Sequence, residues 1–255
     1  MEKEMERFEA AFAKAMSSPI APMDTVLRYV AEAKGKRLRP TLVFLTAKLF
    51  GEINDATRRA ALFVELIHTA TLIHDDVVDG SDMRRGKATV NARWNNTTAV
   101  LCGDHLLSKA VLVLSDPMDH QILVEMLHAA LDMSEGELMQ VKGERLEVRG
   151  EKDYLNIIMR KTARLIESCC VGGAMSVGAS AEEVALVRSF GLNLGLVFQM
   201  RDDILDADDP QQVALAKTLL PEYLERCLKT LEGLPASESL EQLKALAVFC
   251  AERNR

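Results

Sequence analysis

An apolar repeat between Asp55 and Asp79 constrains the fold of this chain more than any other feature. The residues that recur at helical spacing are Leu62, Phe63, Leu66, Ile67, Ala70, Ile73 and Val77. Side chains three or four positions apart lie on one face of an α-helix, so the pattern predicts one long helix that Asn54 or Asp55 caps. About 25 residues of helix extend for roughly 38 Å.

Helical patterns separated by short breaks continue along the chain. We expect further helices at about residues 2–16, 24–35, 40–51, 98–115, 119–145, 151–177, 181–206, 210–232 and 237–252. Strand signals are weak, because no useful stretch alternates between apolar and polar residues and aromatic residues make up 5% of the chain. Within one pattern, Gly172 and Gly173 predict close packing of two helices. The sequence therefore predicts an all-α fold, with residues 1–255 in a single domain.

Composition excludes several classes of function. Acidic residues outnumber basic ones by 38 to 31, and the resulting net charge of −7 disfavours a nucleic-acid partner. The 5 cysteines are odd in number and form no C-x-x-C pair, so neither a disulfide framework nor a zinc site is indicated. The N-terminal stretch alternates in charge, and no apolar run reaches the roughly 18 residues of a membrane span. We expect a cytoplasmic protein with no transmembrane segment.

The acidic motif Asp75-Asp76-Val77-Val78-Asp79 ends the long predicted helix. Positions i and i+4 lie on the same helix face with Cβ atoms roughly 6 Å apart, so Asp75 and Asp79 point in one direction. Carboxylates at this spacing repel one another, and the C-terminal end of a helix disfavours anions. A hard cation with oxygen ligands explains the arrangement, although a solvated acidic helix end explains this motif alone equally well.

The same pattern, Asp202-Asp203-Ile204-Leu205-Asp206, ends a second apolar helical stretch. Two copies of one acidic motif, each closing an apolar helix, are hard to explain as surface charge. If the two helices face each other across a cavity, their carboxylates converge. Because Mg²⁺ prefers a few carboxylates together with water and phosphate oxygens, the pair predicts a magnesium-bridged polyphosphate site.

Basic residues gather close to the first motif. Lys36, Arg37 and Arg39 lie in a loop before a predicted helix, while Arg84 and Arg85 follow Asp79 by a few positions. Guanidinium groups bind phosphate in bidentate fashion and lysine acts as a point charge, so both clusters suit an anionic substrate. Each basic run taken alone is more often a solvated surface.

A further polar pair lies on an otherwise apolar helix. Lys161 and Thr162 supply one cation and one hydroxyl there. His68 precedes Asp75 by about two helical turns, so it lies on nearly the same face of the long helix. A single histidine in a helix is usually a packed residue, and a role as a phosphate donor is a second possibility.

Together these segments resemble the trans-isoprenyl diphosphate synthases, or polyprenyl synthetases. The matching stretches follow the order of that family and are GKRLRP, ELIHTATLIHDDVVDGSDMRRGKATVN, AVLCGDHLL, GELMQ, KTARL and FQMRDDILD. The first motif and its flank are most similar to the long-chain polyprenyl members. The resemblance implies an isoprenoid synthase type helical bundle around a central cavity, assembled as a homodimer. It also implies a prenyltransferase that condenses an allylic diphosphate with isopentenyl diphosphate and uses Mg²⁺.

The resemblance also implies roles for individual residues. The expected metal-binding set is Asp75, Asp76, Asp79, Asp202 and Asp206, with Asp203 in a supporting position. Arg84 and Lys161 are expected to hold the allylic diphosphate. The residues expected to hold isopentenyl diphosphate are Lys36, Arg39, His68 and Arg85, and those expected to line the reacting region are Thr162 and Gln199. Catalysis is expected to depend on Asp75, Asp79, Asp202, Lys161 and Arg84.

The residues just before the first motif predict product length. Short-chain members of the family carry a blocking aromatic residue four or five positions before this motif, where the present chain has Thr71 and Ala70. Phe63, the nearest bulky residue deeper in the helix, lies roughly 18 Å from Asp75 by helix rise. We therefore expect products longer than farnesyl, of the octaprenyl or geranylgeranyl type. The loop of residues 80–96 is the expected lid over the site.

One departure from the family pattern follows the second motif. Family members carry a G-K-x-x-x-x-D segment and then a G-K-x-T-L-P segment, whereas here ADDPQQVALAKTLLP follows Asp206. Residues 217–221 resemble the later segment, and Lys217 is a candidate replacement for the lysine of the earlier one.

Two rival functions are a class I terpene cyclase, which carries a different second motif, and a non-catalytic subunit of a heteromeric synthase, which tends to lose its acidic motifs.

Overall fold

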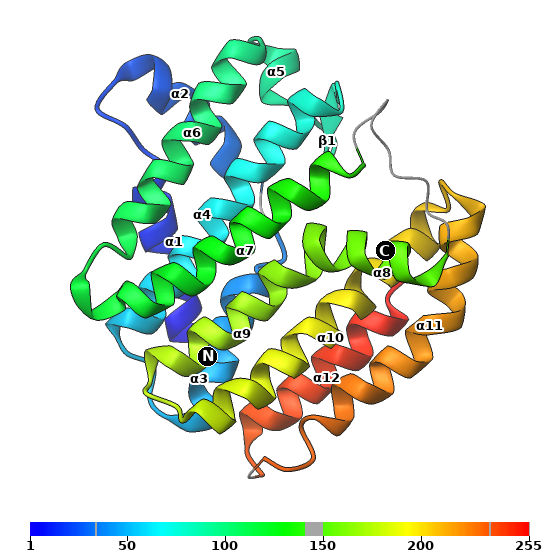
Figure 1. The fold of residues 1–255 in the computed structure, drawn as a ribbon. Helices are drawn as coiled ribbons and strands as arrows, with labels where there is room; N and C mark the ends of the chain where they lie inside the picture. Colours follow the sequence, from blue (N-terminus) through cyan, green and yellow to red (C-terminus); the bar gives the residue numbers. More distant parts are fainter. Residues whose placement is uncertain (34, 141–149, 235, 255) are drawn as a thin grey trace.

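Helices form nearly all of the regular structure (Figure 1). The computed structural model describes residues 1–33, 35–140, 150–234 and 236–254. The N-terminal half contains α1 (Glu2–Ala15), α2 (Ala21–Ala31), α3 (Leu38–Phe50), α4 (Asp55–Val78), α5 (Val90–Arg93) and α6 (Asn96–Val113). After η1 (Pro117–Asp119) come α7 (His120–Leu138), α8 (Glu151–Ile158), η2 (Met159–Ala163), α9 (Arg164–Ser176), α10 (Ala181–Asp206), α11 (Pro210–Lys229) and α12 (Glu238–Glu252). The predicted all-α fold is confirmed.

Some helix boundaries differ from those predicted. The second helix begins at Ala21 because Pro22 occupies its first turn, where a missing backbone N–H costs nothing. The helix predicted over 119–145 ends at Leu138, and residues 141–145 lie outside the described residues. The pattern over 151–177 forms two α-helices joined by η2, a π-helical turn that carries Lys161 and Thr162. Such turns occur often at functional sites.

The long helix α4 is the central element of the N-terminal half. Asn54 is its cap: the Asn54 side-chain oxygen accepts the Thr57 backbone N–H at 3.0 Å, and the Thr57 hydroxyl oxygen accepts the Asn54 N–H at 3.3 Å. α4 packs against α3, α6 and α9. Phe63 and Leu66 are fully buried in these contacts, so the apolar repeat faces the core as predicted.

The helix α9 joins the two halves of the bundle. Both α4 and α10 pack against α9, and α10 also packs against α11 and α12. A Cβ on Gly173 would lie 2.4 Å from the Val43 carbonyl oxygen, which confirms the predicted close approach of two helices. In Figure 1, α4 and α10 both end toward the upper right of the molecule. The two acidic motifs therefore lie at the same end of the bundle.

The segment predicted as a loop over residues 80–96 is largely ordered by hydrogen bonds. It contains the antiparallel strands β1 (Met83–Arg84) and β2 (Lys87–Ala88), followed by α5. The Ser81 backbone N–H donates to the Asp76 carbonyl oxygen at 2.9 Å, and the Asn91 amide donates to the Ser81 carbonyl oxygen at 3.0 Å. The short hairpin is thus attached directly to the end of α4.

Membrane-spanning capacity was tested on the described residues alone. None of their helices is, by itself, both long enough and apolar enough to cross a bilayer. The pair Asn96–Val113 and Pro117–Leu138 meets the length and composition criteria together, with a bend of 97° at its break. Core helices of other proteins meet the same criteria, so this pair is weak evidence for a span.

Candidate active site

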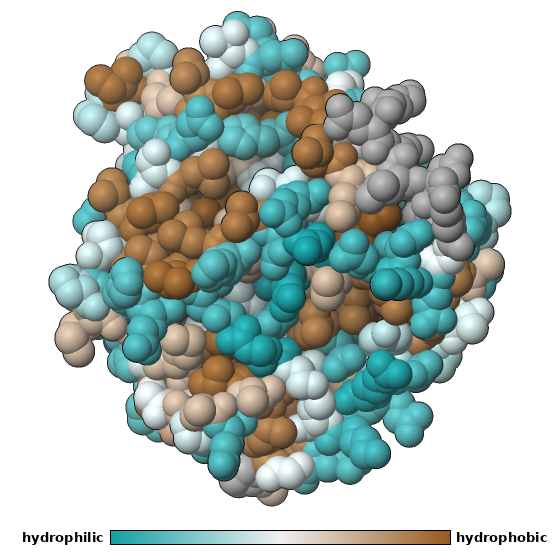
Figure 2. Space-filling model, in the orientation of Figure 1, coloured by the Kyte–Doolittle hydropathy of each residue, from teal (hydrophilic) through white to brown (hydrophobic). Residues whose placement is uncertain are grey.

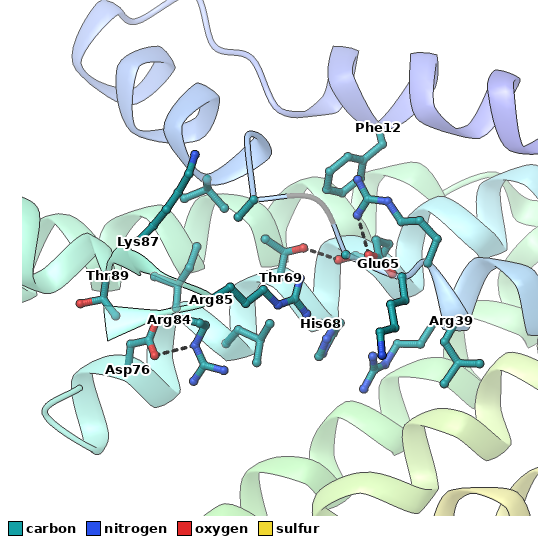
Figure 3. A pocket seen from close by; sticks show the side chains of 18 of the residues that line it. Phe12, Arg39, Glu65, His68, Thr69, Asp76, Arg84, Arg85, Lys87 and Thr89 are labelled. Atoms are coloured by element: carbon teal, nitrogen blue, oxygen red, sulfur yellow. Dashed lines mark hydrogen bonds and ion pairs between the residues drawn. The ribbon is translucent and has the colours of Figure 1, made fainter. Parts of the chain in front are cut away.

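A cavity of about 610 Å³ lies beside the C-terminal half of α4. Its walls come from α1, α2, the loop before α3, the first turn of α3, α4, the β1–β2 hairpin, the start of α5, α10 and the C-terminal part of α12. Figure 3 shows Arg39, His68, Asp76, Arg84 and Arg85 around this space. The cavity therefore joins the first acidic motif to the helix that carries the second.

Three cations at this cavity have no carboxylate partner. Among the residues that the structure describes, Lys36, Arg39 and Arg85 form no ion pair, and the buried Arg39 Nε has no hydrogen-bond partner. Burial, together with Arg39 and Arg85, lowers the pKa of His68 well below 6.5, so the ring is neutral near pH 7. Cations gathered without partners around a neutral donor indicate a binding site for an anion.

The middle carboxylate of the first motif is engaged by the hairpin. Arg84 Nε donates to Asp76 Oδ1 at 2.7 Å, and Asp76 is 5% exposed. Arg84, which the sequence predicts to hold the allylic diphosphate, thus neutralises a buried carboxylate at the edge of the cavity. Both roles are compatible, because a guanidinium group has five N–H donors and this ion pair uses one.

Asp75 faces a different set of residues on the other side of α4. Its carboxylate forms no hydrogen bond or ion pair with the described residues. Burial raises the pKa of Asp75 to about 7, and Glu137 on α7 acts in the same direction against the opposing effect of Lys161. Lys161 Nζ lies 2.9 Å from Glu137 Oε2. Asp79, one turn after Asp75, is exposed at the end of the helix.

The second motif is held by other side chains of the protein. Arg253, just beyond α12, donates to Asp202 Oδ1 at 2.6 Å, and its guanidinium lies 3.9 Å from the Phe198 ring centroid. Tyr154 donates to Asp203 Oδ2 at 2.6 Å. Asp206 is exposed, and its carboxylate forms no hydrogen bond or ion pair with the described residues. Burial raises the pKa of both Asp202 and Asp203.

The π-helical turn η2 connects the two motifs. Its Lys161 acts electrostatically on Asp75, as described above. The adjacent Thr162 donates to Gln199 Oε1 at 2.6 Å, and Gln199 Nε2 donates to Asp203 Oδ1 at 2.9 Å. Two neighbouring residues of one helical turn therefore face the two acidic motifs, which places both motifs around a common region.

A profile of the polyprenyl synthetase family matches residues 21–219. The chain belongs to the polyprenyl synthetase family. An all-trans-nonaprenyl-diphosphate synthase (geranyl-diphosphate specific) from Rhodobacter capsulatus is 42% identical over 193 residues, which make up 75% of this chain and 59% of that relative. The chain is also similar to the crystal structure of a polyprenyl synthase from Caulobacter crescentus CB15, complexed with calcium and isoprenyl diphosphate. The two structures align with a TM-score of 0.92 and 28% sequence identity, over 100% of this chain and 96% of that one.

A third relative shows that this polyprenyl synthetase is comparatively short. Heptaprenyl diphosphate synthase component 2 from Geobacillus stearothermophilus is 36% identical over 314 aligned positions, which cover 100% of this chain and 95% of that relative. Since the chain has 255 residues, at least 59 of the 314 positions have no counterpart in it. The connection between α10 and α11 consists of residues 207–209 alone. This short connection follows the second acidic motif, where the family pattern has a G-K-x-x-x-x-D segment that this chain lacks.

Lys217 lies away from the cavity of this polyprenyl synthetase. It is exposed on α11, and residues 217–221 continue that helix, with Pro221 in its interior. The cavity lining described above contains no residue of α11. The resemblance of this stretch to the G-K-x-T-L-P segment is therefore not accompanied by a position at the cavity.

The carboxylates of this polyprenyl synthetase suit Mg²⁺ together with a phosphate ligand. Within the described ranges, no three His, Cys, Asp or Glu side chains converge closely enough to hold a metal ion unaided. Mg²⁺ is commonly held by one or two carboxylates, with water and substrate phosphates completing its octahedron. Asp75, which is partly buried and has no protein partner, is a fitting ligand of this kind, and Asp79 lies one turn away on the same side.

Three residues at the site were not predicted from the sequence. Glu137, which forms an ion pair with Lys161, lies inside GELMQ, one of the stretches that resemble the family. That resemblance was a signal that could have indicated a place at the site. Tyr154 precedes Lys161 by seven positions, and helical spacing places the two on a similar face. Arg253 follows no motif, and only the tertiary packing of α12 against α10 shows its position.

Proposed function

We propose that the protein is a trans-prenyltransferase that condenses an allylic diphosphate with isopentenyl diphosphate and forms a polyprenyl diphosphate longer than farnesyl. The observation that carries this proposal is the set of unpartnered cations, Lys36, Arg39 and Arg85, at a cavity shared by the helices of both acidic motifs. A diphosphate supplies the negative charge that these cations lack. Family membership supports the same class of reaction.

Each group has a distinct task in this proposal. Lys36, Arg39 and Arg85 bind the diphosphate of the isopentenyl substrate, and the neutral His68 donates a hydrogen bond to it. Mg²⁺, when bound, neutralises the negative charge that develops on the leaving diphosphate, which favours cleavage of the allylic C–O bond. The residues that would hold this ion are Asp75, Asp79 and Asp202, with Asp76 and Asp206 nearby.

The remaining polar residues orient the allylic substrate. Arg84 and Lys161 bind its diphosphate, while Thr162 and Gln199, which are hydrogen-bonded to each other, line the reacting end. The allylic cation is held against the isopentenyl double bond, and a new C–C bond forms between them. The proton that is then lost passes to the departing diphosphate, since these motifs contain no obvious general base. The hairpin and α5 exclude water, which would otherwise capture the cation.

The residues before the first motif support a long product. Ala70 is fully buried and Thr71 is partly exposed, and neither is large enough to block a growing chain. Ala70→Phe is expected to shorten the main product by several isoprene units, at a packing cost of about 1–3 kcal/mol in stability. Reversed-phase chromatography of dephosphorylated products measures the change. Unaltered product length in a folded Ala70→Phe protein would contradict this assignment.

The predicted homodimer has a candidate surface. Exposed apolar side chains on α6 and α7 are Val100, Leu101, Val111, Leu112, Val124, Leu127, Leu131 and Leu138. Figure 2 shows an apolar patch over these two helices. We propose that a second copy covers this patch, since large exposed apolar patches mark interaction sites. Light scattering gives the mass in solution.

The cytoplasmic location of the protein stays a prediction.

A direct assay tests the proposed reaction and separates it from its rivals. Purified protein is incubated with Mg²⁺, labelled isopentenyl diphosphate and geranyl, farnesyl or geranylgeranyl diphosphate in turn. Incorporation of label into products longer than farnesyl is expected with the protein alone. A terpene cyclase would consume the allylic substrate without incorporating label. A non-catalytic subunit would incorporate no label when it is incubated alone.

A further inference from the structure

Arg37 has an unusual backbone conformation for a residue with a side chain. Its φ of 52° and ψ of 34° lie in the left-handed region, immediately before the first turn of α3. Non-glycine residues adopt this region at a cost in free energy, and they keep it where surrounding contacts determine it. Lys36, which precedes it, and Arg39, two positions later in the first turn of α3, are two of the unpartnered cations at the cavity.

Two carboxylates hold the Arg37 side chain. Arg37 Nη1 donates to Glu65 Oε1 on α4 at 2.7 Å, and this pair is 11% and 7% exposed. Arg37 Nε and Nη2 donate to the two carboxylate oxygens of Glu9 on α1, at 2.8 and 3.1 Å. The bidentate contact fixes the plane of the guanidinium group. Arg37 thus joins the loop before α3 to two other helices.

Aromatic rings fix the same guanidinium from a third direction. It lies 4.4 Å from the centroid of the Phe12 ring and 5.7 Å from that of Phe8. Both rings are nearly fully buried on α1. Stacking of a guanidinium on aromatic faces adds attraction and restricts its movement. Figure 3 shows Phe12 and Glu65 on the same side of the cavity as Arg39 and His68.

The charge balance separates Arg37 from its neighbours. Its single positive charge is opposed by two carboxylates, so the cluster of Arg37, Glu9 and Glu65 is net negative. Such a cluster does not attract a diphosphate. Lys36 and Arg39, by contrast, have no ion pair among the described residues. Arg37 therefore binds other side chains of the protein, while Lys36 before it and Arg39 in the first turn of α3 remain available to an anion.

The contacts of Arg37 also set the loop against the opposite wall of the cavity. Glu65 precedes His68 by three positions on α4, so the two lie on one face of that helix. At the start of the loop, a Cβ on Gly35 would lie 3.1 Å from Arg85 Nη1, which shows how closely the loop approaches the hairpin arginine. Fixing the loop to Glu65 therefore fixes its distance from both His68 and Arg85.

We propose that Arg37 is a positioning residue that holds the loop of residues 35–37 and the first turn of α3 so that Lys36 and Arg39 bind isopentenyl diphosphate together with His68 and Arg85. This inference rests on the proposed function of the cavity. In this role Arg37 does not contact the substrate, and it acts through the backbone that connects it to Lys36 and Arg39. The geometry gives a reason for an arginine at a position where glycine would fit the backbone without strain.

Arg37→Asn tests this role, because asparagine tolerates the left-handed conformation but lacks the guanidinium. The KM for isopentenyl diphosphate is expected to rise about tenfold, while kcat and the KM for the allylic substrate stay within about twofold. Arg37→Lys, which keeps a charge for Glu65, is expected to restore part of the loss. Glu9→Gln, on the more exposed side of the cluster, is expected to raise the KM about threefold.

Arg58 supplies a matched control. It also joins α1 to α4, with Nε and Nη2 at 2.8 and 3.1 Å from the carboxylate of Glu4, but it lies outside the cavity lining. Arg58→Asn is expected to lower the melting temperature without changing either KM. A KM for isopentenyl diphosphate in Arg37→Asn equal to that of the wild type, or an equal rise in Arg58→Asn, would overturn the positioning role.

Calorimetric titration of the wild-type protein with isopentenyl diphosphate separates this inference from the proposed function. Binding is expected, and it is expected to weaken about tenfold in Arg37→Asn. A wild-type protein that does not bind the compound would end both the proposed function and the role of Arg37. If the wild type binds and Arg37→Asn binds equally well, the role of Arg37 alone is refuted. Circular dichroism reports whether each variant is folded, and Glu9→Gln provides the same comparison if Arg37→Asn is not.

Discussion

The two D-D-x-x-D motifs have the same pattern of aspartates but different surroundings. In the first motif, Asp75 has no hydrogen-bond partner among the described residues, and burial raises its pKa to about 7. In the second motif, Arg253 binds Asp202, and both Tyr154 and a glutamine bind Asp203. The first motif thus has a free carboxylate at its leading position, whereas the second has its first two carboxylates occupied by the protein.

For the proposed metal–diphosphate complex, this difference predicts unequal contributions from the two motifs. A buried carboxylate without a partner is stabilised most by an incoming cation, since nothing must be displaced. A metal ion at the second motif has to compete with the guanidinium of Arg253 for Asp202. The residues that precede the two motifs also differ. Four and five positions before the first motif are Thr71 and Ala70, whereas Phe198 and Val197 occupy the same positions before the second.

The largest predicted effect comes from removing the free carboxylate. Asp75→Asn is expected to lower kcat by at least about 10³-fold, because it removes a charge that would hold the metal ion beside the leaving group. Asp203→Asn is expected to cost less, about 10- to 100-fold, because Asp203 acts through its hydrogen-bonded neighbours. Steady-state rates at saturating Mg²⁺ measure both. Equal losses in the two variants would contradict the unequal roles.

Removing the hydroxyl that holds the second motif is expected to have a moderate effect. Tyr154→Phe leaves one Asp203 oxygen without its donor, so we expect kcat to fall about tenfold and the free energy of unfolding to fall by about 2 kcal/mol. Urea denaturation and steady-state kinetics measure the two quantities. Wild-type kinetics in a variant with lowered stability would show that Tyr154 serves the fold alone.

Removing the Arg253 guanidinium, which competes with a metal ion for Asp202, is expected to have a smaller effect and to favour metal binding. In Arg253→Met, Asp202 loses its ion pair, so the Mg²⁺ concentration that gives half-maximal binding of inorganic pyrophosphate is expected to fall about threefold. Arg201→Met is the control, since Arg201 Nε donates to the Arg253 carbonyl oxygen at 2.8 Å and its removal leaves the guanidinium on Asp202 in place. A weaker requirement for Mg²⁺ in both variants, or a stronger one in Arg253→Met, would contradict the competition.

The smallest predicted effect comes from the imidazole ring of His68, which α4 carries and which α10 lacks at the corresponding position. Seven positions before the motifs stand His68 and Gly195, so only the first helix carries this ring. The groups that lower the pKa of His68, after burial, are Arg39, Arg85, Arg84 and Arg37. Below pH 6.5 the unfolded chain binds a proton at this position that the folded protein does not yet bind. Stability should therefore fall as the pH decreases from 6.5 toward the lowered pKa of the folded state.

His68→Gln removes this titration. Urea midpoints measured at several pH values between about 5 and 7.5 are expected to fall less steeply in the variant than in the wild type. Parallel curves for the two proteins would show that His68 does not carry the effect.

Much of the fold and part of the site could be predicted from local patterns. The apolar repeat of α4 and the two acidic motifs are periodic in sequence, and helical spacing alone predicts which side chains share a face. The hairpin at Met83–Ala88 was missed because two strands of two residues each leave no alternating pattern. The π-helical turn at Lys161 was also missed, since it depends on how α7 and α10 pack around that segment.

The partners of the charged residues could not be predicted, because they come from distant parts of the chain. Nothing near Asp202 in sequence indicates Arg253, and nothing near Arg37 indicates Glu9 or Glu65. These ion pairs depend on which helices pack together, which residue periodicity does not specify. The motifs predicted where carboxylates gather, but the structure was needed to see which of them the protein already occupies.

A crystal structure of the protein with Mg²⁺ and a non-hydrolysable bisphosphonate tests the central claim most directly. We predict one bisphosphonate between α4 and α10, with metal ions that bridge it to Asp75 and Asp79 on one side and to Asp202 on the other, and with the Arg253 ion pair broken. Metal ions bound at one motif only, or a bisphosphonate bound away from both, would contradict the account.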